Sequence, residues 1–385
     1  MRILHLCLGN FFIDNYSYQE NMLAKYHVRQ GHDVTVIASL FTFGENGEGR
    51  WLDAPSSYQA SDGYRVIRLG FKKPLKWNRF FRHYEGLYAA LEETDPDVIF
   101  SHNVSYGDTG VVARYLNAHP KVRLFADNHA DFVNSAKNRL SRRILHPVIW
   151  RHYAQKLVPY LVKCYGVTPM RCRFLKEMYH IPSPLVEYLP MGVDDDLIPA
   201  DRIASRRSFR EEHHIPQDAF VVVTGGKIDR LKNTHVLLDA LEKMDDPSVH
   251  LLLCGVLTPE MMYLKERIER NASVHDMGWC DAARVMACMN ASDLACFPGT
   301  HSTLWEQAVG LGLPGVFKRW PEMEHVNVNG NCLFVKGEDV DELSEVLRSL
   351  VSGDVYATLL GRAAEASGAF QYSRIAARAI GKLDS

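Results

Sequence analysis

The chain has 385 residues, of which 46% are hydrophobic and 23% are charged, and its formal net charge at pH 7 is −2. This length exceeds what one hydrophobic core usually holds, so we expect two globular domains. No apolar run approaches the roughly 18 residues of a membrane helix, so we expect a cytoplasmic protein, and the small net charge argues against nucleic acid as a partner.

Apolar strands alternate with amphipathic helices along the first half of the chain. Strands are expected over residues 2–8, 34–38, 64–69, 98–101 and 122–126, and helices over 18–30 and 84–91. This alternation predicts a parallel sheet covered by helices. Ligands of such sheets bind beyond the carboxyl ends of the strands, so the loops after Leu8, Ser101 and Ala126 are the places to expect a site.

The loop after the strand over 122–126 is unusually polar. It reads Asp127-Asn-His129-Ala-Asp131, and His129 could hydrogen-bond a ligand or assist proton transfer. A histidine tied to Asp127 or Asp131 for structural reasons is the alternative. His102, after another strand, is a weaker candidate. Clustered aspartate and histidine can also indicate a metal.

The alternating pattern restarts after a proline-rich stretch at 182–190. Further strands are expected over 220–224, 250–254, 273–276, 294–297, 315–317 and 332–335, separated by helices over 233–242, 282–289, 303–309 and 340–351. The predicted fold class is therefore α/β, with two Rossmann-like doubly wound domains, 1–190 and 191–365, facing a cleft.

The loop after the strand over 220–224 carries basic residues. Gly226 allows a close approach of the backbone, and Lys227 and Lys232 could neutralise a departing diphosphate. An ordinary solvated loop is the alternative. G-x-x-x-x-G-K-[ST] is absent, which disfavours a P-loop ATPase, and G-x-G-x-x-G is absent after the first strand, which disfavours a standard NAD-binding half.

Residues 296–306 read as the end of a strand, a loop of small residues and the start of a helix. Backbone N–H groups around Ser302 and Thr303 could converge on an anion. Glu306, in the first helical turn, could accept both hydroxyls of a ribose. Thr303 and Glu306 also fit a capping box, in which the carboxylate only satisfies its own helix terminus.

Ordered motifs over nearly the whole chain resemble the GT-B glycosyltransferases, specifically the retaining, nucleotide-sugar-dependent family 4 (group 1) enzymes. The motifs are Leu8-Gly9-Asn10, Arg29-Gln-Gly-His-Asp-Val34, Tyr188-Leu-Pro-Met-Gly192-Val-Asp194, Gly226-Lys227 with Lys232, Leu252-Leu-Cys-Gly255, and Trp305-Glu306-Gln-Ala followed by Gly310-Leu-Gly-Leu-Pro314.

The resemblance implies transfer of a sugar from a nucleotide diphosphate sugar, with UDP-sugars favoured, to a glycan or lipid-linked glycan in cell-surface polysaccharide or glycoconjugate synthesis. It implies no cofactor and no metal, and a C-terminal helix within 366–385 that packs on the first domain. The implied residues are His129, Lys227 and Lys232 for catalysis; Gly226, Lys227, Lys232, Gly255, Ser302, Thr303 and Glu306 for the donor nucleotide; and Gly9, Asn10, His102 and Asp127 on the acceptor side.

The chain departs from the family pattern at one central position. The family commonly carries two glutamates eight positions apart; Glu306 fits the second, but Pro298 stands at the first. Proline cannot supply a carboxylate. This departure keeps two alternatives open: a nucleotide-sugar epimerase of the same architecture, and a noncatalytic protein that binds nucleotide sugars.

Two segments of the first half mix basic and aromatic residues, Lys72–Arg82 and Lys137–Arg151. Residues 1–180 carry a net charge of +8, and the remainder carries −10. Cations seek anionic headgroups and Trp and Phe settle at the interface, so the segments predict peripheral attachment to the inner face of the cell membrane. Ordinary surface helices are the alternative, and the acidic second half disfavours single-stranded nucleic acid.

The eight cysteines are scattered. They form no C-x-x-C pair and have no companion histidine at zinc-site spacing. This distribution predicts reduced thiols and no metal site.

Overall fold

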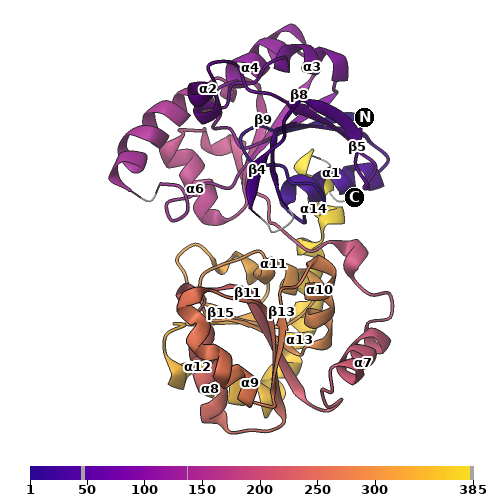
Figure 1. Cartoon of the computed structure of the whole chain (residues 1–385), viewed down its shortest axis with the longest axis vertical. Coiled ribbons are helices and arrows are strands. Elements are labelled where there is room, and N and C mark those ends of the chain that lie inside the picture. The colour runs from indigo at the N-terminus through magenta and orange to yellow at the C-terminus, as the bar shows by residue number, and fades with distance from the viewer. Residues whose placement is uncertain (45–47, 137, 382–385) are drawn as a thin grey trace. The chain divides into compact units, whose positions relative to one another are not determined.

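The computed structural model describes residues 1–44, 48–136 and 138–381, which form two compact units. One unit comprises Met1–Pro190 and Ser373–Ser385, and the other comprises Met191–Tyr372. Figure 1 shows that each unit is a twisted sheet with helices on both of its faces. The α/β fold class predicted from the sequence is therefore confirmed.

The first unit contains an eight-stranded sheet that is parallel except at one edge, where β5 runs antiparallel to β6. In spatial order its strands are β10 (Val186–Tyr188), β9 (Leu161–Gly166), β8 (Arg123–Asn128), β7 (Val98–His102), β1 (Arg2–Cys7), β2 (Asp33–Ser39), β6 (Arg65–Leu69) and β5 (Ser56–Gln59). A separate antiparallel pair is formed by β3 (Phe41–Phe43) and β4 (Gly49–Trp51).

The central strands of this sheet are buried over nearly their whole length. Parallel strands covered on both faces need continuous apolar runs, and residues 98–100 of β7 and 124–126 of β8 supply them. The helices that cover them are α1 (Gln19–Arg29), α2 (Leu75–Phe81), α3 (Leu87–Thr94), α4 (Thr109–Ala118), the π-helix η1 (Ser141–Trp150), α5 (Arg151–Gln155) and α6 (Pro169–Met178), with 3₁₀ turns η2 (Val158–Tyr160) and η3 (Ser183–Leu185).

The last helix, α14 (Tyr372–Ala379), packs on the first unit. His27 Nε2 donates to the Ala376 carbonyl at 2.8 Å, and the Arg378 carbonyl accepts a hydrogen bond from the Tyr165 hydroxyl at 3.1 Å. The chain enters this unit at Ser373, later than the predicted 366, because α13 and the turn after it belong to the second unit. Residues 382–385 of the predicted segment lie outside the described residues.

The second unit contains a six-stranded sheet that is parallel throughout its described strand pairs. In spatial order the strands are β13 (Val274–Gly278), β12 (Val249–Leu257), β11 (Phe220–Ile228), β14 (Leu294–Phe297), β15 (Gly315–Lys318) and β16 (Cys332–Val335). The carboxyl ends of β11 and β14 lie next to each other in this order, so the loops that follow them meet at one edge of the sheet.

The helices of the second unit begin with side-chain caps at several termini. Asp201, Asp281 and Asp339 each accept a hydrogen bond from a backbone N–H of the first turn that follows, as N-cap residues do. The helices are α7 (Arg202–Glu212), α8 (Thr234–Met244), α9 (Lys265–Arg270), α10 (Ala282–Ala291), α11 (Leu304–Leu311), α12 (Val340–Val351) and α13 (Asp354–Ala366), with 3₁₀ turns η4 (Asp195–Leu197), η5 (Arg230–Lys232), η6 (Pro259–Leu264), η7 (Glu324–Val326) and η8 (Ser367–Phe370).

Among the described residues, every helix is too short or too polar to cross a membrane.

Candidate functional site

Glycines bring β11 and β12 into close backbone contact at the edge where a ligand is expected. A Cβ placed on Gly225 would lie 2.1 Å from the carbonyl oxygen of Cys254, and one on Gly255 would lie 2.0 Å from that of Gly226. Gly226 also has a φ of +99°, which side chains rarely adopt. Larger residues at these positions would push the two strands apart, so the predicted Gly226 and Gly255 shape this edge through their backbones.

The loop after β14 packs on the loop after β11. A Cβ on Gly299 would lie 2.3 Å from Cα of Lys232, and Lys232 Nζ donates to the carbonyl oxygens of Thr300 and His301 at 2.8 and 3.4 Å. Burial lowers the pKa of Lys232. An ammonium group has three N–H donors, so one donor remains for a further acceptor.

Pro298 takes part in this packing through its backbone. Its carbonyl oxygen accepts a hydrogen bond from Asn233 Nδ2 at 3.1 Å, and the same amide donates to the Gly337 carbonyl at 2.7 Å. The position that usually carries the first glutamate is therefore a structural junction between three loops. It offers a ligand no carboxylate.

Helix α11 begins at Leu304, so Glu306 lies in its first turn. The side chain of Thr303 makes no capping hydrogen bond, and both bonds to the Glu306 carboxylate come from histidines instead. The capping-box alternative is therefore wrong for this helix. Trp305 faces the core and stacks on Phe317 with ring centroids 4.7 Å apart, which fixes the rotation of the helix and keeps Glu306 at the sheet edge.

Glu306 is fully buried, and one of its oxygens is held by two histidines. His301 Nε2 and His325 Nε2 each lie 2.8 Å from Oε1. Oε2 is also buried and has no hydrogen-bond partner among the described residues. Burial alone would raise the pKa of Glu306, but the two histidines outweigh it and hold the pKa well below its usual range.

This arrangement prepares a carboxylate oxygen for a ligand. An unsatisfied buried acceptor costs free energy comparable to a lost hydrogen bond, and a hydroxyl of a bound ligand would remove that cost. The ligand atoms of His301, Glu306 and His325 also lie within 4.8 Å of one another, a spacing that could hold a metal ion. His325 could not be predicted from the sequence, because it comes from η7 after a different strand.

The other residues predicted to bind the donor nucleotide lie around this edge and differ in their solvent exposure. Lys227, at the end of β11, is exposed, and its side chain makes no hydrogen bond or ion pair with the described part of the chain. Ser302 Oγ is buried without a partner among the described residues. Thr303 is exposed. The geometry thus assembles two lysines, a buried hydroxyl and a carboxylate oxygen on one sheet edge.

The first unit has a cavity of about 500 Å³ at the carboxyl ends of its central strands. Of the predicted acceptor-side residues, Gly9 and Asn10 line it, whereas His102 and Asp127 are buried behind it; His129, predicted to take part in catalysis, also lines it. Aromatic and basic side chains form much of the remaining wall: Trp51, Phe71, Arg79, Phe80, Arg82 and Trp150. The cavity therefore combines flat apolar surfaces with cations.

Arg82 contributes to this cavity in a way that the sequence did not reveal. Its guanidinium donates to the carbonyl of Gly9 and lies 3.5 Å from that of Ser105, so it holds the loop after β1. Burial lowers the pKa of Arg82. Asn10 is held by Glu20, with Nδ2 donating to Oε1 at 2.7 Å.

Asp127 joins His129 and His102 at the back of the cavity. His102 Nδ1 lies 2.9 Å and His129 Nε2 lies 3.5 Å from Asp127 Oδ2. Burial would raise the pKa of Asp127, but the two histidines outweigh it and hold the pKa well below its usual range. Burial lowers the pKa of His129, yet Asp127 outweighs that effect and the pKa is raised. His129 thus contacts Asp127 and also lines the cavity.

A chain of buried histidines runs from Asp127 to the C-terminal helix. His102 Nε2 lies 2.9 Å from His5 Nδ1, and His5 Nε2 lies 3.0 Å from His27 Nδ1; His27 Nε2 then reaches the Ala376 carbonyl. Both ends of the chain only accept hydrogen bonds, so its four bonds need four N–H groups, but three neutral imidazoles supply three.

One additional proton must therefore reside in this chain. Burial holds the pKa of His5 well below its usual value, so His5 is neutral, and the low pKa of Asp127 keeps that carboxyl ionised. The additional proton therefore belongs to the hydrogen-bonded chain as a whole, and its positive charge offsets the buried Asp127 carboxylate.

Comparisons with known proteins agree with this architecture. Residues 21–197 match the family model described as Glycosyltransferase Family 4, and residues 205–366 match the one described as Glycosyl transferases group 1. A search of curated proteins found no sequence match.

Several solved structures share the fold over nearly the whole chain. HepE from Anabaena in complex with UDP is 17% identical, with a TM-score of 0.67 and 98% of each chain covered. WaaG, a glycosyltransferase involved in lipopolysaccharide biosynthesis, is 17% identical, with a TM-score of 0.64, covering 98% of this chain and 100% of WaaG. A protein assigned as a UDP-N-acetylglucosamine 2-epimerase from Listeria monocytogenes is 11% identical, with a TM-score of 0.61 over 98% of this chain and 94% of that protein.

At these identities the structural likeness establishes the fold, and the two matched family models establish the relationship. The chain belongs to the family 4, group 1 glycosyltransferases and is a glycosyltransferase of the GT-B fold.

Proposed function

We propose that this enzyme transfers a sugar, with retention of anomeric configuration, from a nucleotide diphosphate sugar to a glycan or lipid-linked glycan in cell-surface polysaccharide or glycoconjugate synthesis. The observation that carries the donor assignment is Glu306, whose buried Oε2 has no partner among the described residues and lies on the sheet edge that carries Lys227 and Lys232. A UDP-sugar is the favoured donor, and the crystal structures of HepE with UDP and UDP-glucose support this choice.

The donor would be held by its ribose and its diphosphate. Oε2 of Glu306 accepts the ribose hydroxyls, because charge-assisted hydrogen bonds to a carboxylate are the strong ones. Lys232 keeps its two carbonyl partners and offers its third N–H to a phosphate oxygen, while exposed Lys227 reaches the same diphosphate as a mobile point charge. Both lysines stabilise the negative charge that develops as the nucleoside diphosphate leaves.

His129 would act on the acceptor side of the reaction. Its raised pKa favours the protonated ring, and the protonated ring serves as a hydrogen-bond donor to the transferred sugar and not as a general base. Asp127 holds the ring in place. Because this proposal uses only side chains and the substrate diphosphate, we expect no metal requirement for the transfer step, and transfer that is lost on chelation and restored only by Mg²⁺ or Mn²⁺ would contradict that expectation.

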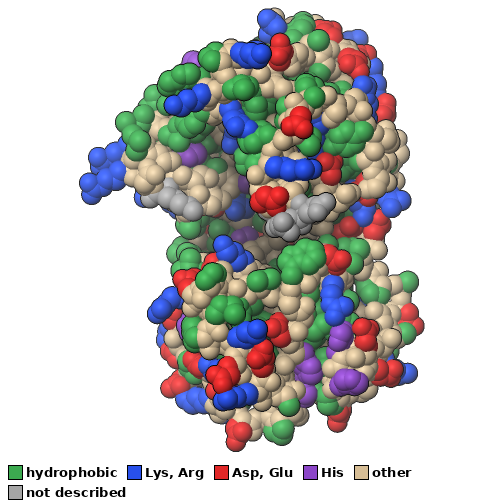
Figure 2. Space-filling view, viewed as in Figure 1, with side chains coloured by type: hydrophobic (Ala, Val, Ile, Leu, Met, Phe, Trp, Pro, Cys, Tyr) green, Lys and Arg blue, Asp and Glu red, His purple; other side chains and the backbone are tan. Residues whose placement is uncertain are grey.

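The acceptor cavity adjoins a surface suited to a membrane. Helix α2 exposes Trp77 at 64%, Leu75 at 59% and Phe80 at 53% of their side-chain surface, and Figure 2 shows hydrophobic and cationic side chains intermixed over this part of the first unit. Phe80 also lines the cavity and lies 6.2 Å from the ring of Trp150. A lipid-linked acceptor could therefore lie on this surface and place its glycan in the cavity.

The second predicted basic segment contributes only partly to this surface. Ile144 and Val148 in η1 and Leu140 just before it are exposed beside Arg142 and Arg143, but Trp150 is 7% exposed and packs inward. Lys137 lies outside the described residues. Exposed aliphatic side chains among cations are typical of helices that lie on an anionic bilayer, so we propose attachment to the cytoplasmic face of the membrane.

Because Pro298 stands where the family usually has a glutamate, two alternatives to the main proposal stay open. An epimerase would convert the nucleotide sugar without an acceptor, and a noncatalytic protein would bind the nucleotide without turnover. The carbonyl of Pro298 accepts a hydrogen bond from Asn233, so the residue supplies no free group for catalysis, and the two histidines at Glu306 are the candidates to assist the donor sugar.

Thermal unfolding of the full chain with nucleoside diphosphates and their sugars tests the donor assignment. A ligand that binds only the folded state raises its stability by RT ln(1 + [L]/Kd). We expect UDP and a UDP-sugar to raise the Tm, and UMP to do so much less because it lacks the second phosphate. Equal shifts with UMP and UDP would contradict the proposed role of the lysines.

A further inference from the structure

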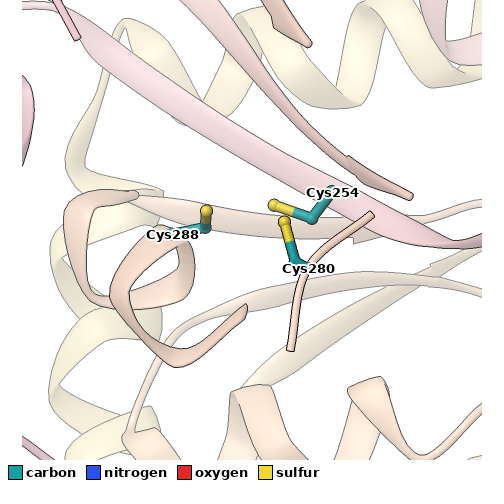
Figure 3. Close-up of side chains that lie close together, drawn as sticks. All are labelled: Cys254, Cys280 and Cys288. Atoms are coloured by element: carbon teal, nitrogen blue, oxygen red, sulfur yellow. The ribbon is translucent and has the colours of Figure 1, made fainter. Parts of the chain in front are cut away.

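Three cysteines of the second unit bring their sulfur atoms together although they are far apart in sequence. Cys254 lies in β12, Cys280 follows β13 and Cys288 lies in α10 (Figure 3). Their three Sγ atoms lie within 4.8 Å of one another. The sequence spacing did not predict this cluster, because the fold and not a short motif assembles it.

The backbone is shaped to point Cys254 at the other two thiols. Along the pairing of β12 with β13, Leu253 lies opposite Asp276 but Cys254 lies opposite Gly278, so the register shifts at this residue. A bulge of this kind turns the side chain of the strand in a new direction. Figure 3 shows the sulfur of Cys254 turned toward that of Cys280, with Cys288 approaching from the helix.

The three sulfurs are close to the spacing of a coordinated set. Zn–S bonds of about 2.3 Å in tetrahedral geometry place ligand sulfurs about 3.8 Å apart, so shifts of about 1 Å or less would complete the site. Cys254 and Cys288 are buried, whereas Cys280 is only partly so. Cys280 therefore marks the side on which an ion could enter and a water could complete the fourth position.

The ligand set of the cluster selects the kind of cation. Three thiolates with a divalent ion carry a net charge of −1. Sulfur ligands without carboxylates select soft metals over Mg²⁺ or Ca²⁺.

We propose that Cys254, Cys280 and Cys288 form a thiolate site for one thiophilic metal ion of the Zn²⁺ class. The ion displaces the thiol protons and replaces the weak contacts of the Cys280 sulfur with the carbonyls of Met277 and Gly278, at 3.7 and 3.5 Å. The site is separate from the histidine pair on Glu306. It joins β12, the loop after β13 and α10.

A bound ion would also touch the proposed donor site. The carbonyl of Cys254 packs against Gly225, and Cys254 directly precedes Gly255, whose close contact with Gly226 shapes the sheet edge. Fixing Cys254 therefore fixes the strand end on which Gly255 lies. This consequence rests on the proposed function, but the metal site itself does not.

Titration of the reduced, metal-free full chain with Cd²⁺ tests the proposal. Cadmium thiolates absorb in the ultraviolet and histidine or carboxylate complexes do not, so the signal distinguishes this cluster from the histidine pair. We expect saturation at one equivalent, at least a tenfold weaker affinity in Cys280→Ser, and displacement of Cd²⁺ by Zn²⁺. Cys172→Ser is the matched control, since Cys172 is also a partly buried cysteine but lies in the first unit.

Cys280→Ser alters the partly exposed member, so it should preserve the fold, and circular dichroism checks this. Thiol labelling gives a second readout: Zn²⁺ should protect one fewer thiol in Cys280→Ser than in the wild type and should protect the same set in Cys172→Ser. No thiolate absorption at one equivalent in the folded wild type, or equal Cd²⁺ affinity in Cys280→Ser and the wild type, would overturn the proposal. Either result is independent of whether nucleotide binds.

Discussion

Replacing Glu306 with glutamine tests the proposed ribose contact with the smallest change in shape. Oε1 accepts from His301 and His325, and Oε2 has no partner among the described residues. Glutamine can keep its oxygen toward the histidines, which places an NH₂ group where Oε2 stood. A group that accepted hydroxyl protons then becomes a donor.

The expected loss follows from the type of hydrogen bond. Bonds to a charged group contribute about 1.5–3 kcal/mol, against about 1 kcal/mol for neutral pairs. Losing the charge and one acceptor position should therefore weaken UDP binding by about 2–3 kcal/mol, or roughly 30- to 150-fold in Kd. Calorimetry with UDP measures this loss of affinity, and calorimetry with 2′-deoxy-UDP shows whether the loss arises at the ribose 2′-hydroxyl.

The two nucleotides distinguish a ribose contact from a structural effect. The wild type should bind UDP clearly more tightly than 2′-deoxy-UDP, and Glu306→Gln should bind the two with similar Kd. Glu324→Gln is the matched control, because Glu324 precedes His325 but is more than half exposed and pairs with Arg319. If Glu306→Gln weakens both nucleotides equally, the carboxylate supports the fold and does not contact the ribose.

Four further changes have defined outcomes. Lys232→Ala should lower the transfer rate about 10²- to 10³-fold, as the loss of a stabilising charge at a leaving group does, and should weaken UDP more than uridine in calorimetry; equal losses would contradict the diphosphate contact. His129→Ala should reduce kcat while the UDP affinity stays within about twofold, and an unchanged kcat would remove His129 from the site. Asp127→Asn should lower the free energy of unfolding at pH 7 by about 3–5 kcal/mol because it breaks a buried pair. Since the folded pKa of Asp127 is low, this contribution is fully present above the unfolded carboxyl pKa and is lost as the pH falls below it. Urea unfolding should therefore show a smaller difference between Asp127→Asn and the wild type at pH 3.5, and a difference that does not change with pH would contradict the ion pair. Trp77→Ala should reduce flotation with anionic liposomes relative to Val162→Ala, a change at another exposed apolar residue of the same unit. Flotation that depends neither on Trp77 nor on anionic lipid would refute the proposed membrane surface.

Strands with continuous apolar runs could be predicted from the sequence to within a few residues. The strands β7, β8, β11 and β14 are all of this kind, because burial on both faces leaves a pattern that needs no long-range information. Strand β9 was not predicted, since Lys163 interrupts its apolar run. Its place is set by pairing with β8, which is a tertiary effect.

Site residues could be predicted where glycine, polar or charged residues follow the carboxyl end of a predicted strand. The residues Gly9, Asn10, His129, Lys232 and Glu306 all follow or flank the carboxyl ends of strands, and the structure places them on two such edges, one in each unit. His325 and the three clustered cysteines could not be predicted in the same way. Their roles depend on side chains that meet across different elements, and no short spacing encodes that.

Proton positions in the histidine chain also depend on tertiary contacts. His5, His27 and His102 are separated by long stretches of sequence, yet their hydrogen bonds require one proton more than three neutral rings supply. Nitrogen NMR of the ring atoms would detect this additional proton. His102 contacts Asp127 on one side and His129 contacts it on the other, so the buried chain supports the acceptor cavity from behind.

Retaining sugar transfer can be tested by product analysis with a labelled UDP-sugar and a lipid-linked glycan acceptor extracted from membranes. We expect a labelled glycolipid whose new linkage keeps the anomeric configuration of the donor, formed at a rate that falls in the Lys232→Ala variant. A labelled nucleotide sugar epimer in the absence of acceptor, or nucleotide binding with no transfer to any extracted acceptor, would contradict this expectation.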